Sequence, residues 1–232
     1  GQGLSAYKPL ACELSEPDSV RACVKAVAAL DKPLDAIICN AGIMALPKLE
    51  QKPGYELQFF TNHVGHFLLV TGLLDKLADT GRVVIVSSDA HRRAPETGIE
   101  FDNLSAERGY SPWRQYGQSK LANILFAREL ARKFAGTNKT ANALHPGVIA
   151  TNLGRHMGGI ANMAFAVAKP LALKSIPEGA ATQCYIATHP SVAKVSGEYF
   201  ADCNVATSSA LGQDMAMAAK LWKVSEEIAA KI

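Results

Sequence analysis

Short apolar runs alternate with longer segments of helical periodicity along the whole chain. The apolar runs, bounded by turn residues, predict strands at residues 7–14, 34–39, 81–88, 140–146 and 197–203. Between them, apolar residues recur at the spacing of one helix face, which predicts helices at residues 16–30, 54–79, 116–134 and 177–188. Strands that alternate with helices are typical of a parallel sheet covered by helices, so the pattern predicts an α/β fold.

The alternation of strands and helices continues to the end of the chain, with no internal repeat and no low-complexity segment. A chain of 232 residues, 48% of them hydrophobic, is long enough to bury one sizeable core. We therefore expect residues 1–232 to form a single domain.

The charge, the cysteines and the longest apolar stretch indicate which ligands and cellular settings the sequence favours. The net charge of +3 comes from 24 basic and 21 acidic residues scattered along the chain, which does not favour nucleic-acid binding. The five cysteines form no C-x-x-C pair, so we predict no disulfide framework, no metal site and a reducing, cytoplasmic setting. The longest apolar stretch, residues 161–173, is interrupted by Lys169 and Pro170, and no transmembrane helix or signal peptide is predicted.

Small and polar residues gather where predicted strands end. In an open parallel sheet, ligands bind at the carboxyl ends of the strands, so these positions are candidates for one site. They are Asn40, Ala41 and Gly42 after the second strand, Ser87 and Ser88 at the end of the third, and His145, Pro146 and Gly147 at the fourth, with Thr151 beyond.

Tyr116 and Lys120 lie four positions apart at the start of a predicted helix, so they share one helix face. A cation within about 4–6 Å of a phenol favours its ionised form, so Lys120 is predicted to lower the pKa of Tyr116. Such a phenol suits the interconversion of an alcohol and a carbonyl, with Ser88 holding the same oxygen. Taken alone, this spacing is also common in surface pairs.

Five motifs, in their order along the chain, favour a functional role for Tyr116 and Lys120. "CNAG" (39–42), "TNHVGHF" (61–67), "VIVSS" (84–88), "YGQSK" (116–120) and "HPGV" (145–148) resemble the ordered motifs of the short-chain dehydrogenases/reductases. "SSDAHRR", "HPGVIATNLGRH" and the long link between Ser88 and Tyr116 are most similar to the branch that contains retinol dehydrogenases. The resemblance implies a Rossmann-type, doubly wound parallel sheet and a cofactor that is NADP or NAD, with NADP slightly favoured.

The resemblance also implies roles for individual residues. Asn62, Ser88, Tyr116 and Lys120 would form the catalytic set, with Tyr116 as acid/base and Ser88 as carbonyl anchor. Lys120 would bind the nicotinamide ribose, and Asn62 would hold a water that links Lys120 to solvent. The cofactor would contact Tyr116 and Lys120 together with Glu13, Leu14, Asn40, Ala41, Gly42, Pro146, Gly147, Val148 and Thr151. Glu13 stands where the family usually has aspartate, and without the other motifs Asn40 and Gly42 would be ordinary loop residues.

Members of the family begin with a strand, a glycine-rich turn and a helix that bind the pyrophosphate. The printed sequence begins at what corresponds to the third strand, so by this resemblance the domain is expected to be N-terminally incomplete. Without this glycine-rich turn, residues 1–232 are expected to bind the cofactor weakly.

These observations predict an NAD(P)-dependent oxidoreductase that interconverts an alcohol and a carbonyl on an apolar small molecule. The apolar segment at residues 157–176 falls where the family places a substrate-covering segment. The alternatives are a reductase of carbon–carbon double bonds, as in protochlorophyllide reductases, and a non-catalytic binding relative. Apolar residues on the helix that begins at Tyr116 predict a homodimer. His63 and His66 have no accompanying ligand cluster, which favours core or surface positions over metal binding.

Overall fold

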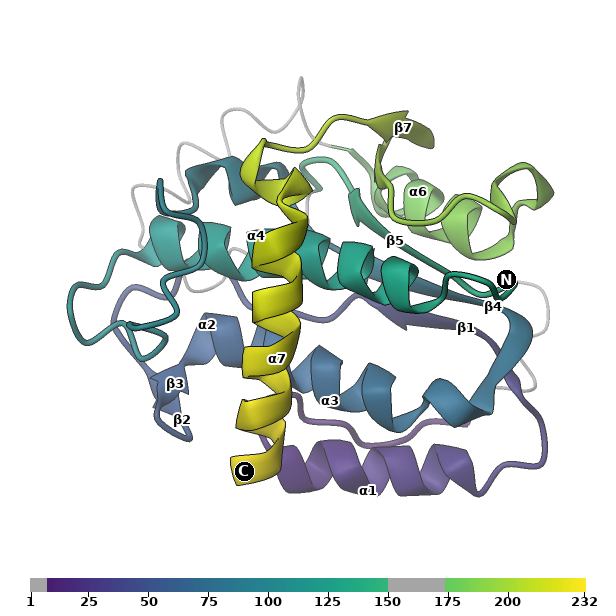
Figure 1. The fold of residues 1–232 in the computed structure, drawn as a ribbon, viewed down its shortest axis with the longest axis horizontal. Coiled ribbons are helices and arrows are strands. Elements are labelled where there is room, and N and C mark those ends of the chain that lie inside the picture. Colours follow the sequence, from purple (N-terminus) through teal and green to yellow (C-terminus); the bar gives the residue numbers. More distant parts are fainter. Residues whose placement is uncertain (1–7, 150–173) are drawn as a thin grey trace.

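A central five-stranded sheet organises the protein, whose computed structural model describes residues 8–149 and 174–232. The strand order is β1-β4-β5-β6-β7, with the first four strands parallel and β7 antiparallel to β6 (Figure 1). The strands are β1 (Leu34–Cys39), β4 (Leu77–Val86), β5 (Thr140–His145), β6 (Tyr199–Ala201) and β7 (Asn204–Ala206). A separate two-stranded ribbon pairs β2 (Gln51–Lys52) with β3 (Tyr55–Glu56). The predicted α/β fold with a parallel sheet is confirmed.

Helices cover both faces of this sheet. The α-helices are α1 (Pro17–Ala28), α2 (Leu57–Phe59), α3 (Gly65–Gly72), α4 (Pro112–Lys133), α6 (Ile176–Thr188) and α7 (Met215–Lys231). The segment η1 (Phe60–Val64) is π-helical and joins α2 to α3. Short 3-10 helices are η2 (Leu74–Lys76), η3 (Asp89–Arg93), η5 (Pro190–Val192) and η6 (Leu211–Gln213).

The strand β4 is buried on both sides because its side chains alternate between two cores. Val83 and Ile85 pack with side chains of α3, α4 and α7 in one cluster. Val84 and Val86 pack with Ile186 of α6 in the cluster on the opposite face. This burial on both faces explains why residues 83–86 at the end of the strand are all apolar rather than alternating with polar ones.

Helix α4 is buried over its central part, because α7 crosses it on the side away from the sheet (Figure 1). Leu121 and Leu125 are 0% exposed and pack with Leu221 of α7. The apolar surplus of α4, which led to the expectation of a homodimer, is therefore covered within the same chain. The α4 surface gives no support for a dimer.

The strand predicted at residues 7–14 is wrong over the described residues 8–14, which form an irregular segment and a turn. A strand forms only when its backbone N–H and C=O groups pair with a neighbour, and none of the described strands pairs with this segment. Leu14 is instead buried against α3, where its carbonyl approaches Gly65 so closely that a Cβ there would lie 2.4 Å from it.

Several predicted boundaries also needed correction. The helix predicted over 54–79 begins after β3 and ends at Gly72. The residues that follow form η2 and then the start of β4. Helix α4 starts at Pro112, four residues before Tyr116, since proline suits the first helical turn. The strand predicted at 197–203 is a tight hairpin of β6 and β7, and α7 was not anticipated. None of the helices in the described part of the chain is long and apolar enough to cross a bilayer.

Candidate active site

Two consecutive serines follow β4 at the carboxyl edge of the sheet and have different surroundings. The hydroxyl of Ser87 is buried and donates to the backbone carbonyl of Lys120 at 2.7 Å. Ser88 is half-buried, and its Oγ accepts a hydrogen bond from the N–H of Ala90 at 3.2 Å. Ser87 therefore ties β4 to α4, while the hydroxyl proton of Ser88 remains available for a neighbouring oxygen. This difference supports the choice of Ser88 over Ser87 as the site residue.

Tyr116 lies in the second turn of α4, with its side chain directed to the same edge of the sheet. It is 4% exposed, and its ring meets Trp113 edge-on at a centroid distance of 6.0 Å. Burial raises the pKa of the Tyr116 phenol to about 12, and a hydrogen bond with Ser88 acts in the opposite direction. The structure thus brings Tyr116 and Ser88 together, as predicted from the sequence.

The predicted lowering of the Tyr116 pKa by Lys120 is wrong for this structure, in which burial dominates and raises it. The Lys120 Nζ lies 5.7 Å from the centre of the Tyr116 ring. Burial also lowers the pKa of the Lys120 ammonium to about 8, so its positive charge is itself destabilised. The i, i+4 spacing correctly placed the two side chains, but spacing carries no information about how deeply both are buried.

Lys120 is held at the end of β4 by the backbone. Its Nζ donates to the carbonyl oxygen of Val86 at 3.1 Å, and the Asn123 amide donates to the same oxygen at 3.0 Å. Among the described residues the ammonium has this one hydrogen-bond acceptor, so its remaining N–H groups can bind a ligand.

Asn62 lies within the π-helical segment η1 and has full hydrogen bonding. Its Oδ1 accepts from the N–H of Ile43 at 2.8 Å, while its Nδ2 donates to the carbonyl of Ile43 and to Ser119 Oγ, both at 2.9 Å. An amide in an apolar helix needs such partners. Asn62 thus ties the loop after β1 to α4 beside Lys120, and π-helical turns frequently mark functional sites. Its role toward a bound water stays a prediction.

The loop after β1 lies against this group. Asn40 and Ala41 are exposed, and Gly42 is half-buried. A Cβ on Gly42 would lie 2.8 Å from Asn62 Oδ1 and 3.6 Å from Lys120 Nζ, so only glycine permits this close approach. The structure thus places Gly42 beside two of the predicted catalytic residues.

The residues after β5 form the opposite side of the sheet edge. Pro146 is half-buried, Val148 is 49% exposed, and Gly147 has φ +85°, a conformation that favours glycine. Lys174 donates its backbone N–H to the carbonyl of Val148 at 2.8 Å. Thr151 and most of the predicted substrate-covering segment lie outside the described residues.

Glu13 and Leu14 do not stand at the end of a strand, contrary to the sequence prediction. The Glu13 carboxylate accepts hydrogen bonds from the N–H and the hydroxyl of Ser15, at 3.1 and 2.9 Å. This local turn occupies one of its oxygens, and Leu14 is buried against α3. Their predicted contact with adenine stays a prediction.

Three contributors to the site were missed in the sequence. They are Ser119, which accepts from Asn62, the carbonyl of Val86, and His91, which contacts the backbone of Ser88. Ser119 lies inside the "YGQSK" motif, so a polar residue on the buried face of that helix was a usable signal. Backbone acceptors leave no trace in the sequence.

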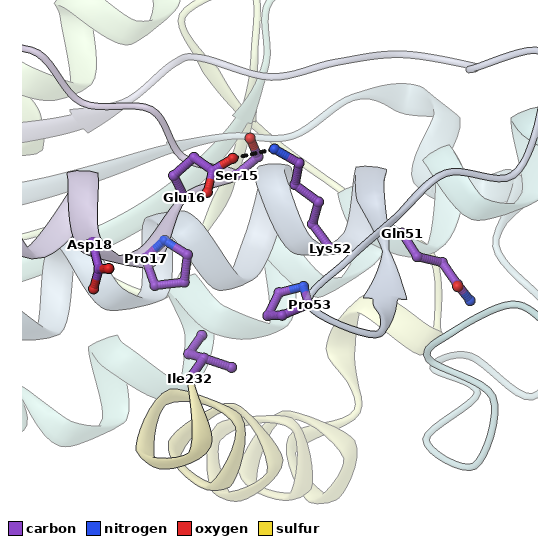
Figure 2. A pocket seen from close by; sticks show the side chains of 8 residues that line it. All are labelled: Ser15, Glu16, Pro17, Asp18, Gln51, Lys52, Pro53 and Ile232. Atoms are coloured by element: carbon purple, nitrogen blue, oxygen red, sulfur yellow. Dashed lines mark hydrogen bonds and ion pairs between the residues drawn. The ribbon is translucent and has the colours of Figure 1, made fainter.

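A hollow elsewhere on the surface is lined by the start of α1, the β2–β3 ribbon and Ile232 (Figure 2). An ion pair between Glu16 and Lys52 crosses it, and both side chains are about half exposed. None of the predicted site residues lines this hollow, so it is separate from the site described above.

Gly117 allows α4 to lie close against the backbone of η3. A Cβ at this position would lie 2.7 Å from both the carbonyl oxygen of Ala90 and the N–H nitrogen of Ala94. We expect Gly117→Ala to push η3 away from α4, to destabilise the fold by about 1–3 kcal/mol and to lower kcat. Urea unfolding and steady-state kinetics measure the two effects.

The control for Gly117→Ala is Ala131→Gly, on the same helix but near its far end. It is expected to cost about 1–2 kcal/mol, through helix propensity and the loss of a partly buried methyl group. If both variants reduce kcat equally, the contact of Gly117 with η3 does not position the site.

Comparisons with known proteins agree with this fold. The sequence model of a family described as enoyl-(acyl carrier protein) reductase matches residues 2–203. Short-chain dehydrogenase TIC 32 A, chloroplastic, of Brassica napus is 45% identical over 228 residues, covering 93% of this chain and 70% of that protein. Retinol dehydrogenase 14 of Homo sapiens is 42% identical over 218 residues, covering 92% of this chain and 64% of that protein.

A solved structure extends the comparison. A putative uncharacterized protein from Mycobacterium paratuberculosis is 33% identical, with a TM-score of 0.73 over 94% of this chain and 73% of that chain. The fold is that of a dinucleotide-binding oxidoreductase. The chain belongs to the short-chain dehydrogenase/reductase family, whose members are NAD(P)-dependent oxidoreductases. It spans 64% to 70% of the length of the two relatives named above.

Proposed function

We propose that the protein interconverts an alcohol and a carbonyl on an apolar small molecule, with Tyr116 as the acid/base. The observation that carries this proposal is the position of Tyr116 at the carboxyl edge of the sheet, where the Ser88 side chain acts on the pKa of its phenol and Lys120 Nζ lies 5.7 Å from the centre of its ring. Two neighbouring hydroxyl groups can both contact the same substrate oxygen.

Each side chain has a different role at the substrate oxygen. With the pKa of Tyr116 raised to about 12, the phenol keeps its proton at neutral pH and can donate it to a carbonyl oxygen. Ser88 donates a second hydrogen bond and fixes the position of the oxygen. Lys120 Nζ lies 5.7 Å from the centre of the Tyr116 ring and does not offset the effect of burial on the phenol pKa. In the reverse direction, the phenolate accepts the proton of an alcohol.

The residues present fit the nicotinamide end of the cofactor. Lys120 has N–H groups without an acceptor among the described residues, and Gly42 and Gly147 bring backbone close to the same edge. When bound, the nicotinamide group supplies or accepts the hydride. Lys120 would hold its ribose, while Asn40, Ala41 and Gly42 would lie toward the adenosine half. The choice between NADP and NAD follows only from the family branch, which favours NADP.

The apolar character of the substrate rests on the relatives. A protein 42% identical to this chain carries the name retinol dehydrogenase 14. Since sequence similarity of this degree spans the catalytic motifs, we infer a substrate of similar chemistry, an alcohol or aldehyde on an apolar body.

A second candidate function is the reduction of a carbon–carbon double bond. The family model that matches residues 2–203 carries the description of an enoyl reductase. In that reaction Tyr116 would still donate a proton, but to a carbon or to an enolate oxygen. A third possibility is a binding protein that keeps these residues without turnover.

Absorbance at the reduced-nicotinamide band separates these functions. Purified protein is mixed with NADPH or NADH and a panel of apolar aldehydes, ketones and enoyl compounds, and with alcohols and the oxidised cofactors. Oxidation of the cofactor by aldehydes or ketones supports the proposal, and turnover of enoyl compounds alone favours the second function. Cofactor binding without turnover of any compound would favour the third.

We also infer a reducing, cytoplasmic setting, because all five cysteines are free thiols. The Brassica napus relative is chloroplastic, so cell fractionation followed by immunodetection is the test of this inference.

A further inference from the structure

His91 lies in η3, three residues after Ser88, and is 1% exposed. Its ring contacts two backbone groups from distant parts of the chain. Nδ1 lies 2.7 Å from the carbonyl oxygen of Ser88, and the N–H of Ser209 donates to Nε2 at 3.0 Å. Both ring nitrogens of His91 therefore form hydrogen bonds within the protein.

These two partners determine the tautomer of the ring. A carbonyl oxygen can only accept, so Nδ1 must carry the proton. An amide N–H can only donate, so Nε2 must be unprotonated. His91 is thus neutral in this arrangement, and burial lowers its pKa, which favours the same form.

The segment that contains Ser209 is itself fixed to the helix that carries Tyr116. The Oγ of Ser209 accepts from the N–H of Gly212 at 3.2 Å. Gly212 lies against α4, where a Cβ would be 3.4 Å from Ile124. The His91 ring is further held edge-on against Tyr199 of β6, with centroids 5.3 Å apart.

We propose that His91 is a positioning residue for Ser88. Through Nδ1 it holds the backbone carbonyl of Ser88, while the Ser209 N–H at Nε2 keeps the ring in the tautomer in which Nδ1 donates. The inference rests on the proposed function, because it assigns the orientation of the Ser88 hydroxyl beside Tyr116 to this ring.

Two variants separate the two hydrogen bonds. In His91→Asn, the amide nitrogen lies as many bonds from Cα as Nδ1, so the variant can still donate to Ser88 but cannot reach Ser209. In His91→Gln, the amide oxygen lies as many bonds from Cα as Nε2, so it can accept from Ser209 but leaves the Ser88 carbonyl without this donor. The variants differ by one methylene, and thermal midpoints establish that both fold.

The expected result is an asymmetric effect on turnover. His91→Gln lowers kcat roughly 10- to 100-fold with little change in KM, because small misplacements of a catalytic group cost this much. His91→Asn retains most of kcat, although the Ser209 amide exchanges its hydrogen faster. In nuclear magnetic resonance spectra, the carbonyl carbon of Ser88 shifts in His91→Gln and stays close to its wild-type position in His91→Asn.

Equal losses of kcat in both variants, or a wild-type kcat in His91→Gln, would overturn the proposal. The measurement of the Ser88 carbonyl signal does not depend on turnover. If Tyr116→Phe keeps full activity, the proposed function fails. An unmoved Ser88 carbonyl signal in His91→Gln instead shows that the ring does not hold this residue.

Discussion

Replacing Tyr116 by phenylalanine is expected to lower kcat/KM by roughly 10²- to 10⁴-fold, the usual contribution of general acid–base catalysis. The substitution deletes one oxygen and keeps the ring, which packs edge-on against Trp113. The phenol otherwise carries the proton that the substrate oxygen needs. Steady-state kinetics on any active substrate, measured together with the thermal midpoint, tests this expectation.

Tyr110→Phe provides a matched control for this variant. The Tyr110 hydroxyl donates to the carbonyl of Leu46 at 2.6 Å and contributes to the loop structure rather than to the proposed chemistry. Its loss is expected to cost about 1 kcal/mol of stability and little activity. A Tyr116→Phe protein that keeps more than about a tenth of wild-type kcat/KM would contradict the acid/base role.

Replacing Lys120 by methionine is expected to abolish turnover while making the fold more stable at neutral pH. The ammonium is buried, and methionine has a similar length without the charge. Burial lowers the Lys120 pKa from the ordinary 10.5 to about 8. By linkage, a difference of this size corresponds to roughly 3 kcal/mol between the two forms. The Val86 carbonyl keeps its hydrogen bond from Asn123.

The pH dependence of this effect has a defined sign. Below about pH 8 the lysine is protonated in both the folded and unfolded chains, so the folded state bears the full cost of the buried charge. Between about pH 8 and 10.5 only the unfolded chain remains protonated, so the free energy of unfolding rises with pH. Above about pH 10.5 the lysine is neutral in both states, so the buried charge no longer destabilises the folded state. The gain in stability of Lys120→Met over wild type should therefore shrink as pH increases through this range.

Urea unfolding of wild type and variant at several pH values measures this difference directly. Lys223→Met, which alters an exposed lysine of α7, is the control and should show no such dependence. A gain that is constant from pH 7 to pH 10.5 would mean that Lys120 is not charged at a cost in the folded state.

The sequence predicted those parts of the fold that depend on local periodicity. The apolar run at 34–39 is a strand at those residues, and the motif residues after it lie at the carboxyl edge of the sheet as expected. Tyr116 and Lys120 also share a helix face, because an i, i+4 relation needs only the helix itself. These features follow from short stretches of chain, and neighbouring elements did not change them.

Features that depend on distant partners were not predicted. The segment at 8–14 has strand composition, but a strand needs a paired neighbour. The pKa of Tyr116 depends on how deeply its ring is buried at the sheet edge, beside Ser88 from another part of the chain. The π-helical turn at Asn62 arises within a helix whose apolar pattern looks continuous. In each case the deciding interaction is long-range, and local composition does not encode it.

The crossing of α7 over α4 also bears on the order in which the protein folds during synthesis. Residues of α4 leave the ribosome long before Met215–Lys231, yet the apolar cluster around Leu121 and Leu125 is completed only when Leu221 of α7 joins it. Until then the nascent chain presents an apolar helix surface of the kind that chaperones bind and that promotes aggregation. The helix that carries the candidate catalytic pair is therefore completed late, and any delay or arrest in translation before α7 leaves it exposed.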